Sequence, residues 1–139
     1  ATVSTGFKSG GFNSEGAFPN LTRDQRGFAP EETTNYELGF KSQLLNNTLQ
    51  LNATVFRMDI EDFQDRAFDG ITLLVRNAGE LRQQGIETDF IWAPIDQLSF
   101  IGGVSYLDSE FEEYLGASPL PGGAPQDLSG ERNHFSPEW

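Results

Sequence analysis

Cysteine is absent from this 139-residue sequence, and histidine and methionine each occur once. Without a thiol the chain can form neither a disulfide bond nor a thiolate metal ligand. The single histidine, His134, has no second imidazole with which to build a histidine-based zinc site. Glu87 and Asp89 would lie roughly 7 Å apart in a strand, a separation that glycosidase carboxylates adopt, but charges of a polar sheet face explain them better. We therefore expect no catalytic residues, no cofactors and no metal ligands, in a protein that is not an enzyme.

Basic residues are scarce as well. Nine Lys and Arg stand against 21 Asp and Glu, so the formal net charge is -12. A phosphate-binding surface needs clustered Lys and Arg, and here they are scattered, which argues against nucleic acid as a partner. The sequence also contains no G-x-G-x-x-G or Walker pattern, so a nucleotide site has no support.

Long apolar runs are missing too. No stretch approaches the roughly 18 consecutive apolar residues of a membrane-spanning helix, so we expect no helical span. Membrane β-strands give a much weaker sequence signal, and their presence stays open. The 15 glycines, 12 phenylalanines and many small polar residues are typical of a strand-and-loop protein.

What the sequence does contain is alternation. Segment 33–60 alternates apolar and polar residues with the two-residue period of a β-strand, interrupted at Asn46 and Asn47. Asn tolerates positive φ, so these two residues are predicted to form the tight turn of an antiparallel hairpin. The register that this turn dictates brings the apolar rows of both arms onto one face. It pairs Leu44 with Leu49, Phe40 with Ala53 and Leu38 with Val55.

The flanking segments repeat this pattern. Residues 1–13 begin as a strand, and segments 85–92 and 98–106 alternate again. Joining the apolar rows of the last two segments requires a connection of three or five residues. That register places Trp92 opposite Leu98 and Phe90 opposite Phe100.

The connections are unequal in length. Residues 14–32 read as a long loop, and residues 60–84 as a polar stretch whose Asp69-Gly70 turn joins a strand pair projecting beyond the main sheet. Residues after Tyr106 become acidic and irregular, and the final residues look like the approach to a further strand. Long loops therefore gather at one end of the sheet and short turns at the other.

Acidic residues concentrate in two clusters that we expect to lie in loops beyond the strand ends. Such charges usually serve solvation and less often bind a divalent cation. The first cluster could hold calcium, but it lacks EF-loop spacing. The clusters are Asp59, Glu61, Asp62, Asp65 and Asp69, and Asp108, Glu110, Glu112 and Glu113.

Two environments fit the apolar face of these hairpins. In a soluble β-sandwich it would form the core, whereas in a membrane barrel it would contact lipid and the polar face would line a wet lumen. Tyr36 and Tyr106 each lie eight residues from the short-turn end, about 20 Å along the barrel axis, and Trp92 lies near the opposite edge. This placement matches the aromatic girdles of outer-membrane barrels and favours lipid.

A series of short motifs also resembles the β-barrel of TonB-dependent outer-membrane receptors. Each motif is short, and their order and spacing carry the resemblance along nearly the whole chain. They are G-F-K-S-G-G-F-N at 6–13, F-A-P-E at 28–31, Y-E-L-G-F-K-S at 36–42, F-R-M-D-I-E-D-F-Q at 56–64, N-A-G-E at 77–80, G-I-E-T-D at 85–89, W-A-P at 92–94, Y-L-D-S-E-F at 106–111, L-S-G-E-R at 128–132 and S-P-E-W at 136–139.

The resemblance implies an all-β fold: an antiparallel up-and-down meander, forming an open curved sheet that is part of a transmembrane β-barrel of about 22 strands. It implies a location in the outer membrane of a Gram-negative bacterium and active uptake of scarce nutrients such as ferric siderophores. The implied partners are the plug domain and remaining barrel of the parent receptor, the TonB complex, outer-membrane lipid and a ferric siderophore or similar ligand. No plug, TonB box or terminal barrel strand is recognisable, so we expect residues 1–139 to be an internal part of the barrel with about five or six membrane strands.

In this barrel reading the two faces of the sheet have assigned environments. The residues expected to face the lumen are Glu37, Lys41, Gln50, Asn52, Glu87 and Asp89. Those expected to face lipid are Tyr36, Leu38, Phe40, Leu49, Leu51, Val55, Phe90, Trp92, Phe100, Val104 and Tyr106.

Two alternatives belong to other functional classes. A soluble β-sandwich could bind carbohydrate, with Trp92, Tyr36 and Tyr106 as exposed stacking platforms. An acidic adhesion module could use calcium held by the loop carboxylates. The position of the apolar face separates them from a barrel, because a sandwich must cover that face with a second sheet.

Overall fold

The computed structural model describes residues 1–14, 19–68, 73–118, 123–134 and 136–139. Strands dominate these residues, and α1 is a single turn of helix. The elements are β1 (Thr2–Lys8), β2 (Gly11–Phe12), α1 (Arg23–Arg26), β3 (Gly27–Phe28), β4 (Glu31–Leu44), β5 (Leu49–Glu61), β6 (Gln64–Phe68), β7 (Leu73–Asn77), β8 (Gly79–Ile95) and β9 (Leu98–Tyr114).

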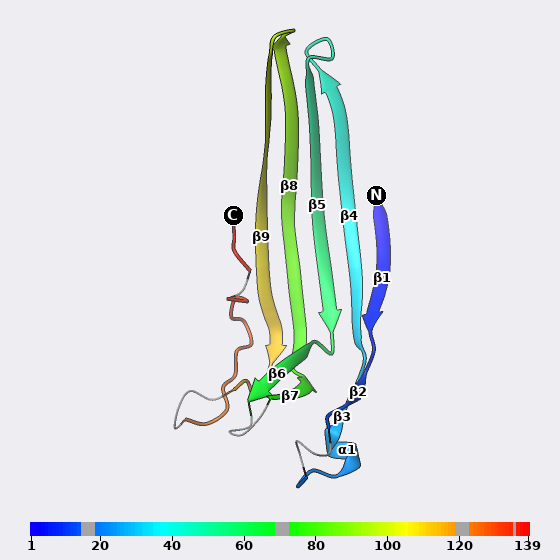
Figure 1. The fold of residues 1–139 in the computed structure, drawn as a ribbon, viewed down its shortest axis with the longest axis vertical. Helices are drawn as coiled ribbons and strands as arrows, with labels where there is room; N and C mark the ends of the chain where they lie inside the picture. The colour runs from blue at the N-terminus through cyan, green and yellow to red at the C-terminus, as the bar shows by residue number, and fades with distance from the viewer. Residues whose placement is uncertain (15–18, 69–72, 119–122, 135) are drawn as a thin grey trace.

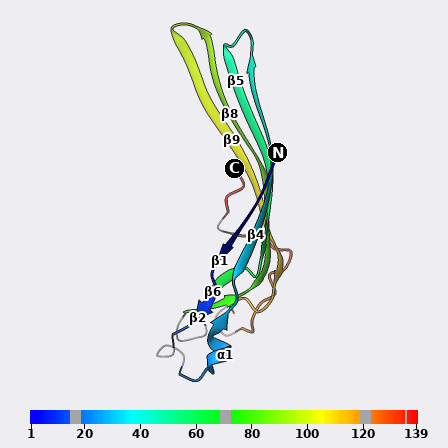
Figure 2. The ribbon, with the colours of Figure 1, turned by 90° about the vertical axis from the view of Figure 1, so that its right-hand side faces the viewer.

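One antiparallel sheet forms the body of the molecule. Its strand order is β1-β4-β5-β8-β9, so strands adjacent in the sheet follow one another along the chain apart from two small excursions. Figures 1 and 2 show this sheet as a single tall layer that curves along its length. The excursions are the two-stranded sheets β2-β3 and β6-β7, which lie together at one end. The all-β up-and-down meander is therefore confirmed.

No helix within the described residues is both long and apolar enough to cross a membrane.

The first hairpin has the register predicted from its turn. Leu44 pairs with Leu49, Phe40 with Ala53 and Leu38 with Val55. The turn occupies residues 45–48, and Leu45 as well as Asn46 and Asn47 is left-handed, with φ values of 52°, 56° and 67°. The predicted register and the positive φ of the two asparagines are confirmed, whereas the turn is longer than the two residues predicted.

The register predicted for the second hairpin is wrong. Trp92 lies opposite Phe100, and Phe90 lies opposite Gly102. The strands continue to the pair Ile95 and Leu98, so the turn has two residues instead of three or five.

A β-bulge accommodates the one unpaired residue that was expected to lie in a longer turn. The register shifts between Trp92 and Ile95, where Ala93 and Pro94 stand opposite a single residue. Proline has no N–H to donate to the ladder and is confined to edges and bulges, which explains its place here. Because the shift equals two residues, the apolar rows remain on one face.

The strands also extend further than their apolar rows. β8 begins at Gly79 and β9 ends at Tyr114, so residues that were expected to be loop are sheet. The expectation that the acidic clusters lie in loops is wrong for Asp59 and Glu61 of β5, for Asp65 of β6, and for Asp108, Glu110, Glu112 and Glu113 of β9. Asp62 lies between β5 and β6, and Asp69 lies outside the described residues. Backbone pairing continues past the apolar stripe. Both faces of the sheet become polar there, so the alternation of apolar and polar residues that indicated a strand in the sequence stops before the strand does.

The excursions are partly as expected. β6 and β7 form the predicted strand pair beyond the main sheet, while the Asp69-Gly70 turn lies outside the described residues. Within the predicted loop 14–32, the structure adds α1, which the sequence reading did not include. Thr22 caps this turn: its hydroxyl accepts from the Gln25 N–H at 3.3 Å, and the Gln25 side chain accepts from the Thr22 N–H at 2.9 Å.

The final segment runs beside β9, as the approach to a further strand would. Phe111 N–H donates to the Glu131 carbonyl at 3.0 Å, and Leu107 N–H donates to the Glu138 carbonyl at 2.9 Å. Arg132 forms an antiparallel bridge with Glu110 of β9.

The apolar face of the sheet is uncovered. Phe40 is 60% exposed and Phe100 45%, and no second sheet packs against this face in the part of the chain that the structure describes. Among the described residues, the buried apolar side chains lie at the end of the sheet beside β6-β7: Ala78, Leu81, Phe111, Tyr114 and Ala117. The β-sandwich alternative is contradicted, because its core would have to lie on the face that is open.

A charge placed on the apolar face should be costly only in a bilayer. We expect Phe40→Arg to lower the free energy of unfolding of the lipid-embedded protein by about 2–4 kcal/mol, the cost of a cation near the bilayer midplane. Gln50→Arg, on the polar face of the same hairpin, should change it by less than about 1 kcal/mol. Guanidinium titration in lipid vesicles measures both, and equal losses would contradict a lipid-facing stripe.

Candidate ligand site at the long-loop end of the sheet

The polar face brings together the residues that the sequence assigned to a lumen. The strand registers place Lys41, Asn52 and Asp89 side by side on β4, β5 and β8, and Asn52 Nδ2 donates to Asp89 Oδ2 at 2.8 Å. Glu37, Gln50 and Glu87 share this face by the same registers. That the face borders a lumen remains a prediction. Asp89 is engaged by an amide, which fits a structural polar row better than a pair of catalytic acids.

The opposite face carries every residue that was assigned to lipid. Aromatic rings mark both ends of the stripe: Trp92 stacks on Phe100 with centroids 5.6 Å apart, and Tyr106 meets Trp139 at 4.9 Å. The strand registers align Tyr106 with Leu38 of β4, so Tyr36 lies one position further along the same face. Tilted barrel strands produce such a stagger.

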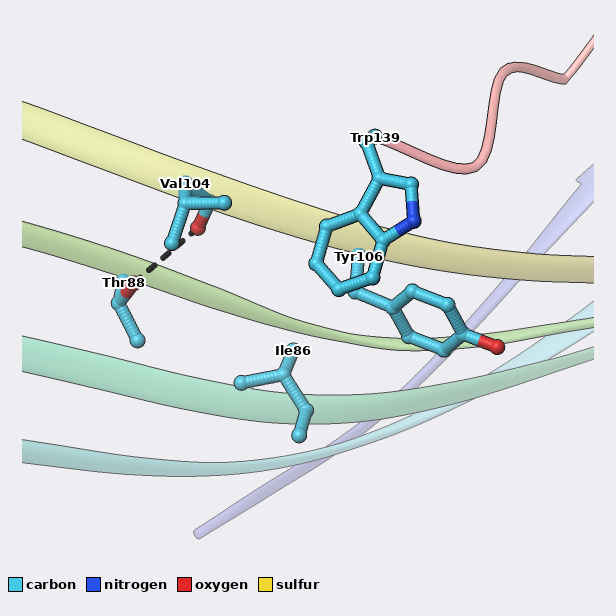
Figure 3. A pocket seen from close by; sticks show the side chains of 5 residues that line it. All are labelled: Ile86, Thr88, Val104, Tyr106 and Trp139. Carbon is cyan, nitrogen blue, oxygen red and sulfur yellow. Dashed lines mark hydrogen bonds between the residues drawn. The ribbon is translucent and has the colours of Figure 1, made fainter.

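An apolar hollow of about 430 Å³ lies on this outer face beneath Trp139 (Figure 3). It is lined by Ile86, Thr88, Val104, Tyr106 and Trp139, and the Thr88 hydroxyl is already used, donating to the Val104 carbonyl at 3.1 Å. The hollow therefore offers hydrocarbon contacts and little to orient a polar ligand.

Charged residues replace the apolar stripe on the outer face towards the long-loop end. Arg57 donates to Asp59 at 2.9 Å, and Arg82 bridges Asp59 at 3.5 Å and Glu112. The hydrogen bonds from the Arg57 guanidinium lower the pKa of Asp59. These carboxylates are therefore paired with guanidinium groups.

The calcium alternative finds no site in the described residues. No group of three or more acidic or histidine side chains there is close enough to hold a metal ion. Of the acids singled out in the sequence, Asp59 binds two arginines and Asp65 accepts the Tyr114 hydroxyl on another part of the surface.

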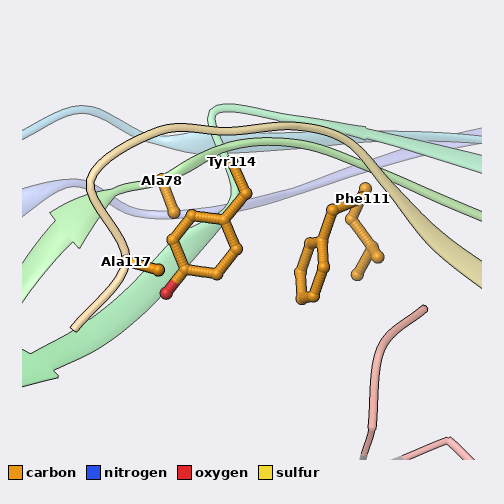
Figure 4. Packing of buried hydrophobic residues seen from close by; sticks show 5 residues of the cluster. Ala78, Phe111, Tyr114 and Ala117 are labelled. Carbon is orange, nitrogen blue, oxygen red and sulfur yellow. The ribbon is translucent and has the colours of Figure 1, made fainter. Parts of the chain in front are cut away.

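The long-loop end holds a small aromatic cluster (Figure 4). Phe63 lies 6.0 Å from Phe111, and Phe111 meets Tyr114 edge-on at 4.9 Å. Leu81, 3% exposed, packs beneath them. Phe111 and Tyr114 come from the end of β9, whereas Phe63 comes from the start of the β6-β7 excursion, so the cluster joins the sheet to its loops.

Beside this cluster is a hollow of about 500 Å³, which we call the loop pocket. Its wall combines aromatic surface with groups that donate and accept hydrogen bonds, the usual composition of a site for an organic ligand. One side comes from the β6-β7 excursion and the other from β9 and the segment after it. The lining residues are Phe63, Asp65, Arg66, Phe111, Tyr114, Ala117, Ser118, Leu128, Asn133 and His134.

Tyr114 is the most perturbed group of the loop pocket. Burial raises the pKa of Tyr114 to about 12, and the hydrogen bond that its hydroxyl donates to Asp65 acts in the same direction. The phenol is therefore neutral over the physiological range and serves as a donor. The pocket presents a neutral phenol, a carboxylate, a guanidinium and the imidazole of His134, which can orient a ligand without breaking bonds in it.

None of the loop-pocket residues was predicted as a site from the sequence, apart from Asp65 as a member of an acidic cluster. Phe63, Phe111 and Tyr114 stand in acidic stretches that lack alternation. The sequence signal for these residues was the presence of aromatic side chains inside polar segments. The rules for strand pairing do not predict that such residues share a pocket.

Comparison with known proteins identifies the sheet. The family model described as TonB dependent receptor-like, beta-barrel matches residues 1–139. The chain belongs to the TonB-dependent receptor β-barrel family. The resemblance seen in the sequence is confirmed, and the open curved sheet is part of such a barrel.

Curated relatives agree with this assignment. The metal-pseudopaline receptor CntO of two Pseudomonas aeruginosa strains, UCBPP-PA14 and PAO1, is 33% identical over 96 residues, which are 66% of this chain and 13% of CntO. The probable TonB-dependent siderophore receptor PiuA of Acinetobacter baumannii is 33% identical over 81 residues, which are 58% of this chain and 10% of PiuA. The matched part of the chain thus spans only 10–13% of the length of these relatives.

Alkaline titration should reveal the buried phenol. Tyr114 has a folded-state pKa of about 12, above the unfolded value of about 10, so its contribution to stability is complete below about pH 10 and is lost as the pH rises through about 12. We expect Tyr114→Phe to remove the latest phenolate step from the near-ultraviolet absorbance of the folded protein. Loss of an early step near pH 10 would contradict a buried, proton-retaining Tyr114.

Proposed function

We propose that residues 1–139 are an internal part of an outer-membrane active transporter that takes up a scarce metal as a chelate, most specifically a ferric siderophore, with energy supplied through TonB. One observation carries the proposal: a single sheet, matched throughout by the receptor-barrel family, has an uncovered apolar face and ends in a pocketed cluster of loops. The first feature suits a barrel wall in lipid and the second suits a ligand-receiving mouth.

The two sheet faces then take the environments expected of them. The stripe from Tyr36 to Phe100 contacts hydrocarbon, and the row around Lys41, Asn52 and Asp89 faces the lumen, where it contacts the plug domain or lines the pathway. The free backbone groups of β1 and of β9 pair with neighbouring strands of the parent barrel, because an unpaired edge is not tolerated in hydrocarbon. The location is the outer membrane of a Gram-negative bacterium.

The loop pocket supports a chelate as cargo. Phe63, Phe111 and Tyr114 supply apolar and aromatic surface for an organic shell, and Asp65, Arg66 and His134 supply both signs of charge and several donors. When a metal is already bound by an organic chelator, the receptor has to bind the chelator and need not supply a metal ligand of its own. The relatives CntO, a metal-pseudopaline receptor, and PiuA, a probable TonB-dependent siderophore receptor, point to the same class.

Transport by the full-length receptor tests the proposal. A strain that lacks the receptor, restored with its gene, should accumulate radiolabelled metal from at least one member of a panel of ferric siderophores and other metal chelates. Accumulation should stop when tonB is deleted or the proton gradient is collapsed. Binding of no chelate in the panel, or uptake that continues without TonB, would contradict the assignment.

The loop pocket can be tested separately through its aromatic wall. Phe63→Ala removes the ring that packs on Phe111, and we expect the dissociation constant of the transported chelate to rise by about tenfold, the equivalent of about 1.4 kcal/mol. Phe7→Ala is the matched control, because Phe7 is 77% exposed on β1. Binding to purified receptor in detergent measures both, and an unchanged affinity in Phe63→Ala would place the ligand elsewhere.

A further inference from the structure

Three hollows follow one another along the outer face of β5, β8 and β9. The first is the apolar hollow of about 430 Å³ beneath Trp139 (Figure 3). The second, of about 310 Å³, shares Ile86 and Tyr106 with the first and continues to Gln84 and Asp108. The third, of about 190 Å³, lies beyond the second towards the long-loop end. We call the three hollows together the outer groove.

The outer groove is continuous along β8. Ile86 and Gln84 line the second hollow, and the next two outward-facing residues of the strand, Arg82 and Glu80, line the third. Thr88, in the first hollow, is eight residues from Glu80. Eight residues span about 26 Å along a strand, or about 20 Å along the axis of a barrel with strands tilted by about 40°.

This height matches one leaflet of a bilayer. A bilayer is about 40–45 Å thick with its headgroups, so one leaflet measures about 20–22 Å. The chemistry of the outer groove changes in the same direction, from apolar at Thr88 to charged at Glu80. A lipid in the outer groove would therefore lay an acyl chain against the first hollow and its headgroup against the third.

The third hollow holds charges of both signs, and not all of them are paired. Arg57 donates to Asp59 through Nε and Nη2, and its side chain is 47% exposed, so its Nη1 can reach a further acceptor. Glu61 and Glu80 are exposed, and neither carboxylate has a hydrogen bond or an ion pair within the part of the chain that the structure describes. One guanidinium is therefore open to an anion and two carboxylates are open to a cation.

This charge pattern selects among headgroups. The third hollow is lined by four carboxylates and two guanidinium groups, so a purely anionic headgroup would meet an excess of negative charge. A zwitterionic headgroup avoids that repulsion, because its phosphate can accept from Arg57 while its ammonium donates to Glu61 and Glu80. An ammonium with three N–H groups suits two neighbouring carboxylates.

We propose that the outer groove binds one molecule of phosphatidylethanolamine, with an acyl chain in the first hollow, the phosphate at Arg57 and the ammonium at Glu61 and Glu80. The inference rests on the proposed function only for placing this face in a membrane. It goes beyond that function, because uptake of a chelate requires no particular lipid at the barrel wall. The unpaired carboxylates distinguish this groove from a stripe that accepts any hydrocarbon chain.

Lipid titration of the purified full-length receptor in detergent, followed by native mass spectrometry, tests the proposal. We expect an apparent Kd for phosphatidylethanolamine about tenfold lower than that for phosphatidylglycerol with the same acyl chains. Equal binding of the two lipids would overturn the proposal, as would tighter binding of lipid A, which carries phosphates without an ammonium. No chelate or TonB takes part, so a receptor that transports nothing still gives this result and the two proposals fail separately.

Substitutions locate the bound lipid. Glu61→Gln keeps the side-chain shape and removes one carboxylate, so we expect phosphatidylethanolamine to bind at least about threefold more weakly and phosphatidylglycerol not to. Val104→Trp fills the first hollow from a side chain that is 56% exposed, and it should weaken both lipids. Glu131→Gln removes the same charge from an exposed residue outside the outer groove and is the matched control. Unchanged phosphatidylethanolamine binding in Glu61→Gln, or a loss equal to that in Glu131→Gln, would overturn the proposal.

Discussion

Satisfaction of backbone hydrogen bonds within a single sheet is the constraint on which this structure depends. With the apolar stripe in hydrocarbon, as proposed, no water is available to the peptide groups, and each must pair with a neighbouring strand. This explains why strands of 13 to 17 residues run without interruption through the stripe and continue well past it. It also explains where Pro94 lies, since a residue without an N–H is accommodated at a bulge next to the short turn.

Packing contributes at one end only. The buried cluster around Phe111 and Tyr114 lies where the sheet meets its loops, and the rest of the sheet has no interior. In a soluble protein such a distribution would leave most large apolar side chains in water. In a barrel wall the same side chains contact lipid, so a small cluster is enough to fix the loops on the sheet while the ladder holds the sheet itself.

Prediction from the sequence succeeded where local rules act on neighbouring residues. The Asn46-Asn47 turn predicts one register and the alternation independently requires the same one, so the register of the first hairpin was predicted correctly. The register of the second hairpin was predicted wrongly because one extra residue can be placed either in a bulge or in a longer turn. Both placements keep the apolar residues on one face, so the alternation cannot distinguish them. The ring of Phe90 fills the space that a Cβ at Gly102 would need. The alternation of apolar and polar residues contains no information about this contact. The loop pocket was missed for a broader reason: its walls come from segments up to 71 positions apart, between Phe63 and His134, and they carry no periodic signal.

The outer face changes abruptly from rings to ion pairs. Tyr106 ends the apolar stripe on β9, Arg57 lies one outward-facing position beyond that level, and Asp59 and Arg82 lie two positions beyond it. With the stripe in hydrocarbon, as proposed, moving the sheet two residues deeper would bring Arg57 to the level of the rings, and moving it outward would take the rings out of lipid. In the proposed location, the boundary between aromatic rings and ion pairs would therefore fix the depth of the sheet in the bilayer through this chain's own residues.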